Sequence, residues 1–187
     1  MTQDEYILGL LAIISGMAVT HTIGVVHLLL FNRKRVGWDW LAPLTAGLIT
    51  YLILYSWWVS WAAFHGRETQ ILFGWFLLPV SQLICLFLAA RAILPENGDQ
   101  NLKEHYATVS RYVWGALTAN LVLVLFGLAM RYAITGMGPS DAINLPQLIV
   151  GLAIGLALAV LRWRTVHVVL VPLLCVMTLA GTLTKPL

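Results

Sequence analysis

The sequence predicts an all-α integral membrane protein, a single bundle of six transmembrane helices with both termini on the outer side. Three observations support this fold class: the composition, the spacing of apolar runs and the placement of basic residues. Of the 187 residues, 60% are hydrophobic and 10% are charged, whereas soluble domains are about 45–50% apolar and about 25% charged. The chain therefore has too little polar surface to cover a water-exposed globule.

Six apolar runs are long enough to cross a bilayer, because a hydrocarbon core of about 30 Å takes about 20 helical residues. The fifth is the shortest, and Ser140 and Asp141 are candidate N-caps for an earlier start. No connection is long enough to form a second domain, so residues 1–187 are one transmembrane domain. The predicted spans are residues 6–31, 41–64, 71–94, 112–134, 145–161 and 166–183.

Basic residues set the expected orientation. Three of the eleven, Arg67, Arg131 and Lys185, lie at one end of the spans. By the positive-inside rule, the end with more basic residues faces the cytoplasm, so the N-terminus and the C-terminus face out. Eight basic residues lie at the end expected to face the cytoplasm: Arg33, Lys34, Arg35, Arg91, Lys103, Arg111, Arg162 and Arg164.

The eight tryptophans support the same topology. All of them fall near predicted span ends, where aromatic belts form. Four lie at the cytoplasmic ends, namely Trp38, Trp40, Trp114 and Trp163. The other four lie at the outer ends, namely Trp57, Trp58, Trp61 and Trp75.

The longest connection covers residues 95–109. Its Pro95 and the Asn97-Gly98 pair predict a turn. Leu102, Tyr106 and Val109 then recur at helical spacing, which predicts a short interfacial helix. This segment is either a simple connector or a partner-docking surface.

Small residues indicate how the helices pack, because close backbone approach carries packing in hydrocarbon. A stripe in the first span combines Gly9, Ala12, Gly16, Thr20 and Gly24, and the fifth span has Gly151, Gly155 and Ala159. The fourth has Gly115 and Ala119. We expect these small residues to form contacts between helices of one bundle. The alternative is that they form an interface between subunits of a homo-oligomer or with another membrane protein.

Prolines interrupt two spans and indicate an internal repeat. Pro79 is expected to kink the third span and Pro172 the sixth. Segments 88–95 (LAARAILP) and 179–186 (LAGTLTKP) place proline at the same offset. Two copies of a three-helix unit would be inverted in the membrane, as in many transporters.

Polar residues inside the spans mark where a function would reside, because burying them in lipid is costly. We predict a polar lining formed by His21, His27, Gln82, Asn120 and Arg131. Asn120, Gly127 and Arg131 share one narrow helix face, and His27 shares the face of Thr20, which predicts that it points into the bundle. The alternative is that these groups only hydrogen-bond the helices together.

No cofactor is expected. His21 and His27 are six residues apart and cannot bind one metal or haem iron from the same helix. His65, His105 and His167 lie at span ends or in connections rather than facing them at similar depth. We therefore predict no haem b and no metal site.

Several function classes are disfavoured. All eight acidic residues are terminal or in connections, and carriers that move protons through a carboxylate usually bury one. The chain lacks the common hydrolase, metalloprotease and phosphate-loop motifs, so an enzyme is not expected. The net charge of +3 forms no basic patch, which argues against nucleic acid. Cys85 and Cys175 lie in apolar runs and predict no disulfide, and the acidic start MTQDEYILG predicts a retained first helix rather than a targeting peptide.

Four stretches carry a resemblance to known proteins: GVVHLLLFNRKRVGWDWLAPL, LYSWWVSW, AILP and HYATVSR. Over residues 24–111 the chain resembles a family of uncharacterised bacterial multi-pass inner-membrane proteins. The resemblance implies a location in the bacterial cytoplasmic membrane and supplies no activity.

Two functions remain open at this point. The first is a small channel, permease or exporter for an ion or small solute. The second is a non-transporting module, meaning a small subunit, scaffold or sensor that binds a partner protein, lipid or quinone-like ligand.

Overall fold

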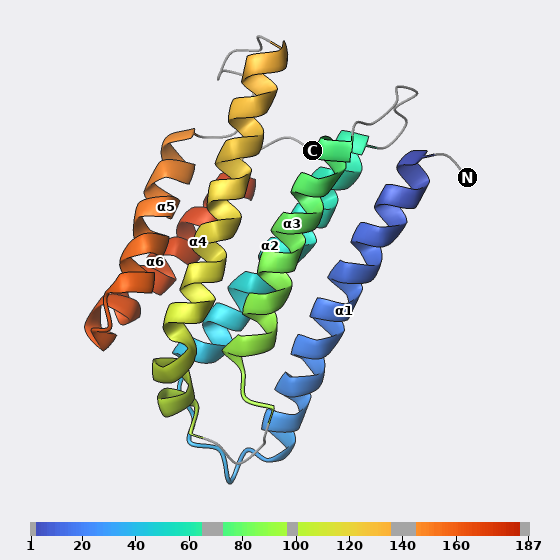
Figure 1. Cartoon of the computed structure of the whole chain (residues 1–187). Helices are drawn as coiled ribbons and strands as arrows, with labels where there is room; N and C mark the ends of the chain where they lie inside the picture. Colours follow the sequence, from blue (N-terminus) through green and yellow to red (C-terminus); the bar gives the residue numbers. More distant parts are fainter. Residues whose placement is uncertain (1–2, 65–72, 97–100, 136–144, 184–187) are drawn as a thin grey trace.

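The chain folds into six α-helices that run alternately up and down (Figure 1). The computed structural model describes residues 3–64, 73–96, 101–135 and 145–183. The first half of the chain forms α1 (Gln3–Phe31), α2 (Leu41–Phe64) and α3 (Phe73–Ile93), and the second forms α4 (Leu102–Thr135), α5 (Leu145–Val160) and α6 (Arg164–Leu183). The predicted all-α architecture of six helices is confirmed. The candidate caps of the fifth span, Ser140 and Asp141, lie outside the described residues.

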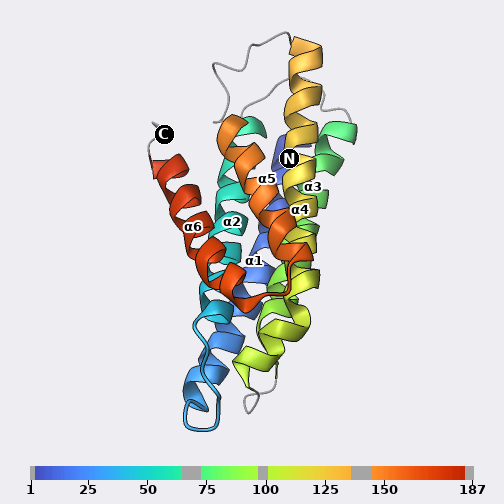
Figure 2. The ribbon, with the colours of Figure 1, turned by 90° about the vertical axis from the view of Figure 1, so that its left-hand side faces the viewer.

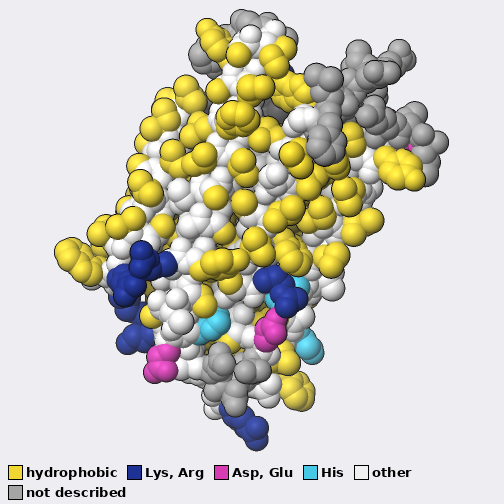
Figure 3. Space-filling view, viewed as in Figure 1, with side chains coloured by type: hydrophobic (Ala, Val, Ile, Leu, Met, Phe, Trp, Pro, Cys, Tyr) yellow, Lys and Arg dark blue, Asp and Glu magenta, His cyan; other side chains and the backbone are white. Residues whose placement is uncertain are grey.

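Five of the six helices are long and apolar enough to cross a membrane. The exception is α5, whose 16 residues extend about 24 Å at 1.5 Å per residue, less than a hydrocarbon core of about 30 Å. Hydrophobic side chains cover the middle of the visible surface in Figure 3, while most charged side chains gather toward its lower end. By helix length and hydropathy, the chain is a multi-pass membrane protein.

Helices α2 to α6 form a closed ring, in which each helix packs against the next and α6 packs back against α2. Helix α1 stands outside the ring and packs against α2 and α3 (Figures 1 and 2). The two three-helix halves are thus packed differently: α1 lies along α3, whereas α4 and α6 do not lie along each other.

The three connections α1–α2, α3–α4 and α5–α6 lie at one end of the bundle, which we call the basic end. Asn101 caps α4 there, because its Oδ1 accepts a hydrogen bond from the backbone N of Lys103 at 3.0 Å. The backbone N of Leu102 also donates to the carbonyl oxygen of Gly37 at 3.0 Å, which ties the first connection to α4.

The expected short interfacial helix is wrong. Residues 102–111 are the first turns of α4, which is 34 residues long. The apolar face that suggested membrane contact is turned inward instead, with Leu102 and Tyr106 buried in the core. A face with helical spacing cannot by itself distinguish lipid from protein as its neighbour.

The small-residue stripe of α1 does not pack within the chain, contrary to the first expectation. Gly9, Ala12, Gly16, Thr20 and Gly24 are all exposed. A Cβ atom added to any of the three glycines would meet nothing within 4 Å. The same holds for Gly115 of α4.

The glycines of helix α5 lie at a helix–helix contact. Gly151 and Gly155 are buried, and a Cβ atom on Gly155 would lie 3.0 Å from the hydroxyl oxygen of Thr118 on α4. These glycines therefore allow close approach of α4 and α5.

The tryptophans are not all in interfacial belts. Trp114 is fully buried in α4, and Trp57 is packed against the hydrophobic core. Trp38, Trp58 and Trp163 are exposed, as belt residues should be. The belt prediction is therefore wrong for Trp114, which lies inside the bundle.

The two kinds of glycine should respond differently to a larger side chain. We expect Gly155→Leu to destabilise the protein by about 1–3 kcal/mol, because it overpacks the α4–α5 contact. Gly16→Leu should leave the monomer's stability unchanged, because the site faces outward. Thermal unfolding of both variants in detergent measures this difference, and equal losses would contradict the assigned packing.

Candidate functional site

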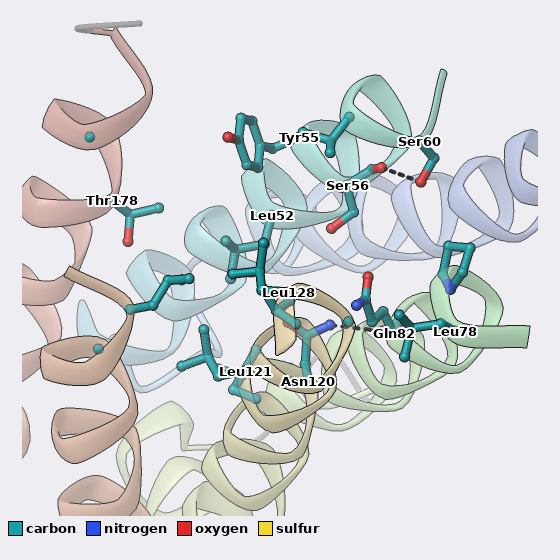
Figure 4. Close-up of a pocket in the computed structure, with 18 of the residues that line it drawn as sticks. Leu52, Tyr55, Ser56, Ser60, Leu78, Gln82, Asn120, Leu121, Leu128 and Thr178 are labelled. Carbon is teal, nitrogen blue, oxygen red and sulfur yellow. Dashed lines mark hydrogen bonds between the residues drawn. The ribbon is translucent and has the colours of Figure 1, made fainter. Parts of the chain in front are cut away.

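A cavity of about 350 Å³ lies inside the ring of α2 to α6 (Figure 4). Its volume falls within the range of small-molecule sites. Most of its lining is apolar or small, and its polar side chains come from all five helices of the ring. These are Tyr55, Ser56, Ser60, Gln82, Asn120, Arg131, Gln147 and Thr178.

The cavity runs from mid-depth toward the end opposite the basic end. The lining residues nearest the basic end include Leu48 of α2, Trp114 of α4 and Gly155 of α5, and on α2 the lining continues to Phe64. Leu48 and Phe64 are 16 positions apart, which corresponds to about 24 Å along the axis of α2 at 1.5 Å per residue. Beyond Trp114 the helices are closely packed, with Leu41 and Thr45 completely buried.

Helices α3 and α4 meet at a polar contact beside the cavity. The side-chain nitrogen Nδ2 of Asn120 donates to the backbone carbonyl oxygen of Gln82 at 3.1 Å (Figure 4). Asn120 is buried, and Pro79, one turn from Gln82, also lines the cavity. Because proline removes a backbone donor, α3 is locally weakened where it forms the wall.

The face of α4 that carries Asn120, Gly127 and Arg131 turns toward the cavity, and all three residues line it. A Cβ atom on Gly127 would collide with Cδ2 of Leu78 on α3. Gly127 therefore permits the close approach of α3 and α4 near the outer part of the cavity.

The two histidines of the predicted polar lining lie elsewhere, on α1 outside the ring. His27 is exposed, so the expectation that it points into the bundle is wrong. Nε2 of His21 is buried and has no hydrogen-bond partner among the described residues. Of the five residues, the structure brings only Gln82, Asn120 and Arg131 to one cavity.

A chain of hydrogen bonds continues from the deep end of the cavity toward the basic end. Nε1 of Trp114 donates to Oη of Tyr106 at 3.1 Å, and that hydroxyl lies 2.9 Å from Nδ1 of His167. Nε2 of His167 lies 2.9 Å from the carbonyl oxygen of Leu161. All three side chains are buried, and the rings of Tyr106 and His167 are perpendicular. This chain links α4 to α6.

An ion pair holds the same end of α6 to the start of α2. The guanidinium of Arg164 contacts both carboxylate oxygens of Asp39, at 2.8 Å and 3.1 Å. The Asp39 side chain is only 3% exposed, whereas that of Arg164 is 44% exposed. The bidentate geometry satisfies a carboxylate that would otherwise be buried without a partner.

Sequence reasoning placed His167 at a helix end and Asp39 in a connection, and so missed both contacts. The sequence separations are 61 residues for Tyr106 and His167 and 125 for Asp39 and Arg164. A lone acid beside three basic residues in the first connection is the one signal that could have drawn attention to Asp39.

Within the described residues, no group of three or more His, Cys, Asp or Glu side chains is placed to hold a metal ion. Comparison with models of protein families, with curated proteins and with solved structures gave no match. The resemblance to a bacterial membrane-protein family therefore stays an expectation.

The ion pair between Asp39 and Arg164 should contribute measurably to stability. We expect Arg164→Ala to cost about 2 kcal/mol, less than the 3–5 kcal/mol of a fully buried pair because Arg164 is half exposed. Arg91→Ala is the matched control, since Arg91 pairs at 2.8 Å with Glu96 and both side chains are exposed. That control should cost about 0–1 kcal/mol. Unfolding in detergent compares the two, and equal losses would contradict a special role for Asp39.

Proposed function

We propose that this protein is a small membrane permease or exporter whose solute-binding chamber is the cavity inside the α2–α6 ring. The observation that carries the proposal is a chamber of about 350 Å³ that reaches from mid-depth to one end of a membrane bundle. Its polar groups, among them Gln82 and Asn120, would lie deep in the hydrocarbon, where polar residues commonly mark transport routes.

The closed basic end favours a carrier over an open channel. Leu41, Thr45, Tyr106 and His167 are buried there, at 0–4% exposure. A carrier opens its chamber to one side of the membrane at a time. A chamber that is closed at Trp114, toward the basic end, corresponds to the state that opens to the opposite side. The prolines inside α3 and α6 supply places where these two walls can bend.

The lining favours a neutral or anionic organic solute, since the charged side chain among the described lining residues is the cation Arg131. Among the described lining residues there is no carboxylate to bind a cation. The hydroxyl and amide groups present both donate and accept hydrogen bonds, and the apolar remainder would cover a hydrocarbon portion. A small molecule with a few polar groups matches this combination better than a bare ion does.

A second candidate is a non-transporting module that binds a lipid or quinone-like ligand in the same cavity. The mostly apolar lining favours this alternative. It predicts that a hydrophobic ligand copurifies with the protein and that no solute crosses the membrane.

We further propose that the chain lies in a bacterial cytoplasmic membrane and crosses it six times, with the basic end inside. Helix α4 ends, and α6 begins, at opposite ends of the bundle (Figure 1). The chain between them must therefore return across the bundle, and the short α5 makes that crossing. The positive-inside rule supports the orientation.

Solute flux tests the transport proposal. The purified protein in liposomes should pass at least one of a panel of potassium, chloride, glycerol, glucose and neutral amino acids. Gln82→Ala and Asn120→Ala should each lower that flux about fivefold, which corresponds to one neutral hydrogen bond of about 1 kcal/mol. Leu174→Trp, which fills the cavity from α6, should reduce it to the rate of protein-free liposomes.

Val176→Trp provides the matched control for the filled cavity. Val176 lies two residues from Leu174 on the same helix and is 64% exposed on the outer surface, so its replacement should leave flux unchanged. Absence of flux for every solute of the panel, together with a copurified hydrophobic ligand, would establish the second candidate instead.

Reporter fusions test the proposed orientation. An enzyme that is active only in the cytoplasm should give activity when inserted after Lys34, in the first basic connection, and none when fused after Leu187. The reverse pattern would invert the topology.

A further inference from the structure

Titratable groups hold helix α6 at its basic end, whereas in the half that lines the chamber Gln147 of α5 donates to the carbonyl oxygen of Met177. Helix α6 packs along α2 and α5 but not along α4. Its link to α4 in the described structure is the hydrogen bond between His167 and Tyr106. Arg164, three residues earlier, binds Asp39 before the start of α2.

The donor and acceptor of each hydrogen bond from Trp114 to His167 can be assigned, because the last acceptor is a backbone carbonyl oxygen. A carbonyl oxygen only accepts, so Nε2 of His167, 2.9 Å from the oxygen of Leu161, carries the hydrogen. In the neutral ring Nδ1 is then an acceptor, and the hydroxyl of Tyr106 donates to it. The indole N–H of Trp114 donates to that same hydroxyl oxygen. The chain therefore runs from the chamber to the basic end, with each donor directed at the next acceptor.

We propose that His167 is a proton-binding site that couples protons to the state of the chamber. This inference rests on the proposed transport function and deepens it by naming the coupled ion. Histidine is the side chain whose ordinary titration falls between pH 5 and 8, so it can supply proton coupling in a membrane span that lacks a buried carboxylate.

Proton binding changes the chain in a defined way. A proton from water at the basic end adds to Nδ1 of His167, and no other bond breaks. Nδ1–H then donates to the oxygen of Tyr106, so the tyrosine hydroxyl must turn its own hydrogen elsewhere. We expect that hydrogen to turn toward the hydroxyl oxygen of Thr45 on α2, which donates its own hydrogen to the carbonyl oxygen of Leu41 and can accept another. The bond between α6 and α4 is thus kept but reversed in direction, and Tyr106 gains a further bond to α2.

The charged and titratable groups around this site come from three elements. Asp39 precedes α2 and carries a negative charge, and Arg164 on α6 carries a positive one. Tyr106 comes from α4. Because Asp39 and Arg164 bind each other in a bidentate pair, the added proton would be the one unbalanced charge of the group.

Two features carry this change to the chamber. Trp114 is both a member of the hydrogen-bond chain and a lining residue of the deep end. On α6, Pro172 lies between His167 and the lining residue Thr178, and it removes the hydrogen bond that would join it to Val168. The basic end of α6 can therefore move relative to the half that lines the chamber.

Thiol accessibility in the full-length protein tests the proposal without a known solute. In a Cys85→Ala, Cys175→Ala background, Thr178→Cys places one thiol in the chamber, and a membrane-impermeant maleimide measures its modification rate at pH 5.5 and 7.5. Rates are divided by those of the same protein with His167→Gln, which cancels the pH dependence of the thiol itself. We expect this ratio to change at least about threefold between the two pH values, because only the protein that retains His167 can bind the proton at this site.

His105→Gln is the matched control. His105 also lies at the basic end and contacts the carbonyl oxygen of Ala92 at 3.0 Å, outside the chain of hydrogen bonds, so the pH response should persist. Tyr106→Phe removes the hydroxyl but retains the ring, and the response should be lost as it is in His167→Gln. A ratio that does not change with pH, or a response that survives Tyr106→Phe, would overturn the proposal.

Solute flux separates this inference from the function on which it rests. If flux is present but neither a pH gradient nor His167→Gln alters it, transport stands and proton coupling is wrong. If the thiol response depends on His167 while no solute crosses, transport is wrong and His167 remains a proton switch of a binding module.

Discussion

Backbone hydrogen bonding is the constraint on which this structure depends. In hydrocarbon no water can satisfy an exposed N–H or C=O group, so each crossing segment must form its own hydrogen bonds as a helix. The side-chain hydroxyls follow the same rule: Thr45, Thr50 and Thr118 each donate to the carbonyl oxygen four residues earlier. Most polarity within the helices is therefore satisfied locally, and the groups that bond between helices stand out.

Those interhelical bonds are few and lie at the walls and the closed end of the chamber. Asn120 holds α3 to α4, the Tyr106–His167 pair holds α4 to α6, and Arg164 holds α6 to the segment before α2. Because α1 stands outside the ring, its polar groups take no part in the chamber. Helix α1 therefore packs against the ring from outside, and the other five helices enclose the cavity.

Close packing of helices makes one side of the ring rigid, whereas opening the chamber requires a helix that can move. Gly127 and Gly155 allow α3, α4 and α5 to approach closely and give that side a rigid contact. Helix α6 contacts α5 through Gly181 and Gln147 in its outer half. At its basic end it is joined to α4 and to the segment before α2 by polar bonds. A wall held by such bonds can change position when their charge changes, while a wall held by close packing cannot.

The helical membrane fold could be predicted from the sequence, because apolar length, proline and charge act locally along each helix. The sequence placed α2 at residues 41–64 and put Asn120, Gly127 and Arg131 on one face, since helical periodicity requires it. Which face of each helix meets protein rather than lipid depends on the three-dimensional packing. Small residues recur every three or four positions in both α1 and α5, yet the glycines of α1 are exposed and Gly151 and Gly155 of α5 are buried. His27 and Trp114 were misplaced for the same reason: lipid and protein interior are equally apolar, so hydrophobicity cannot tell them apart.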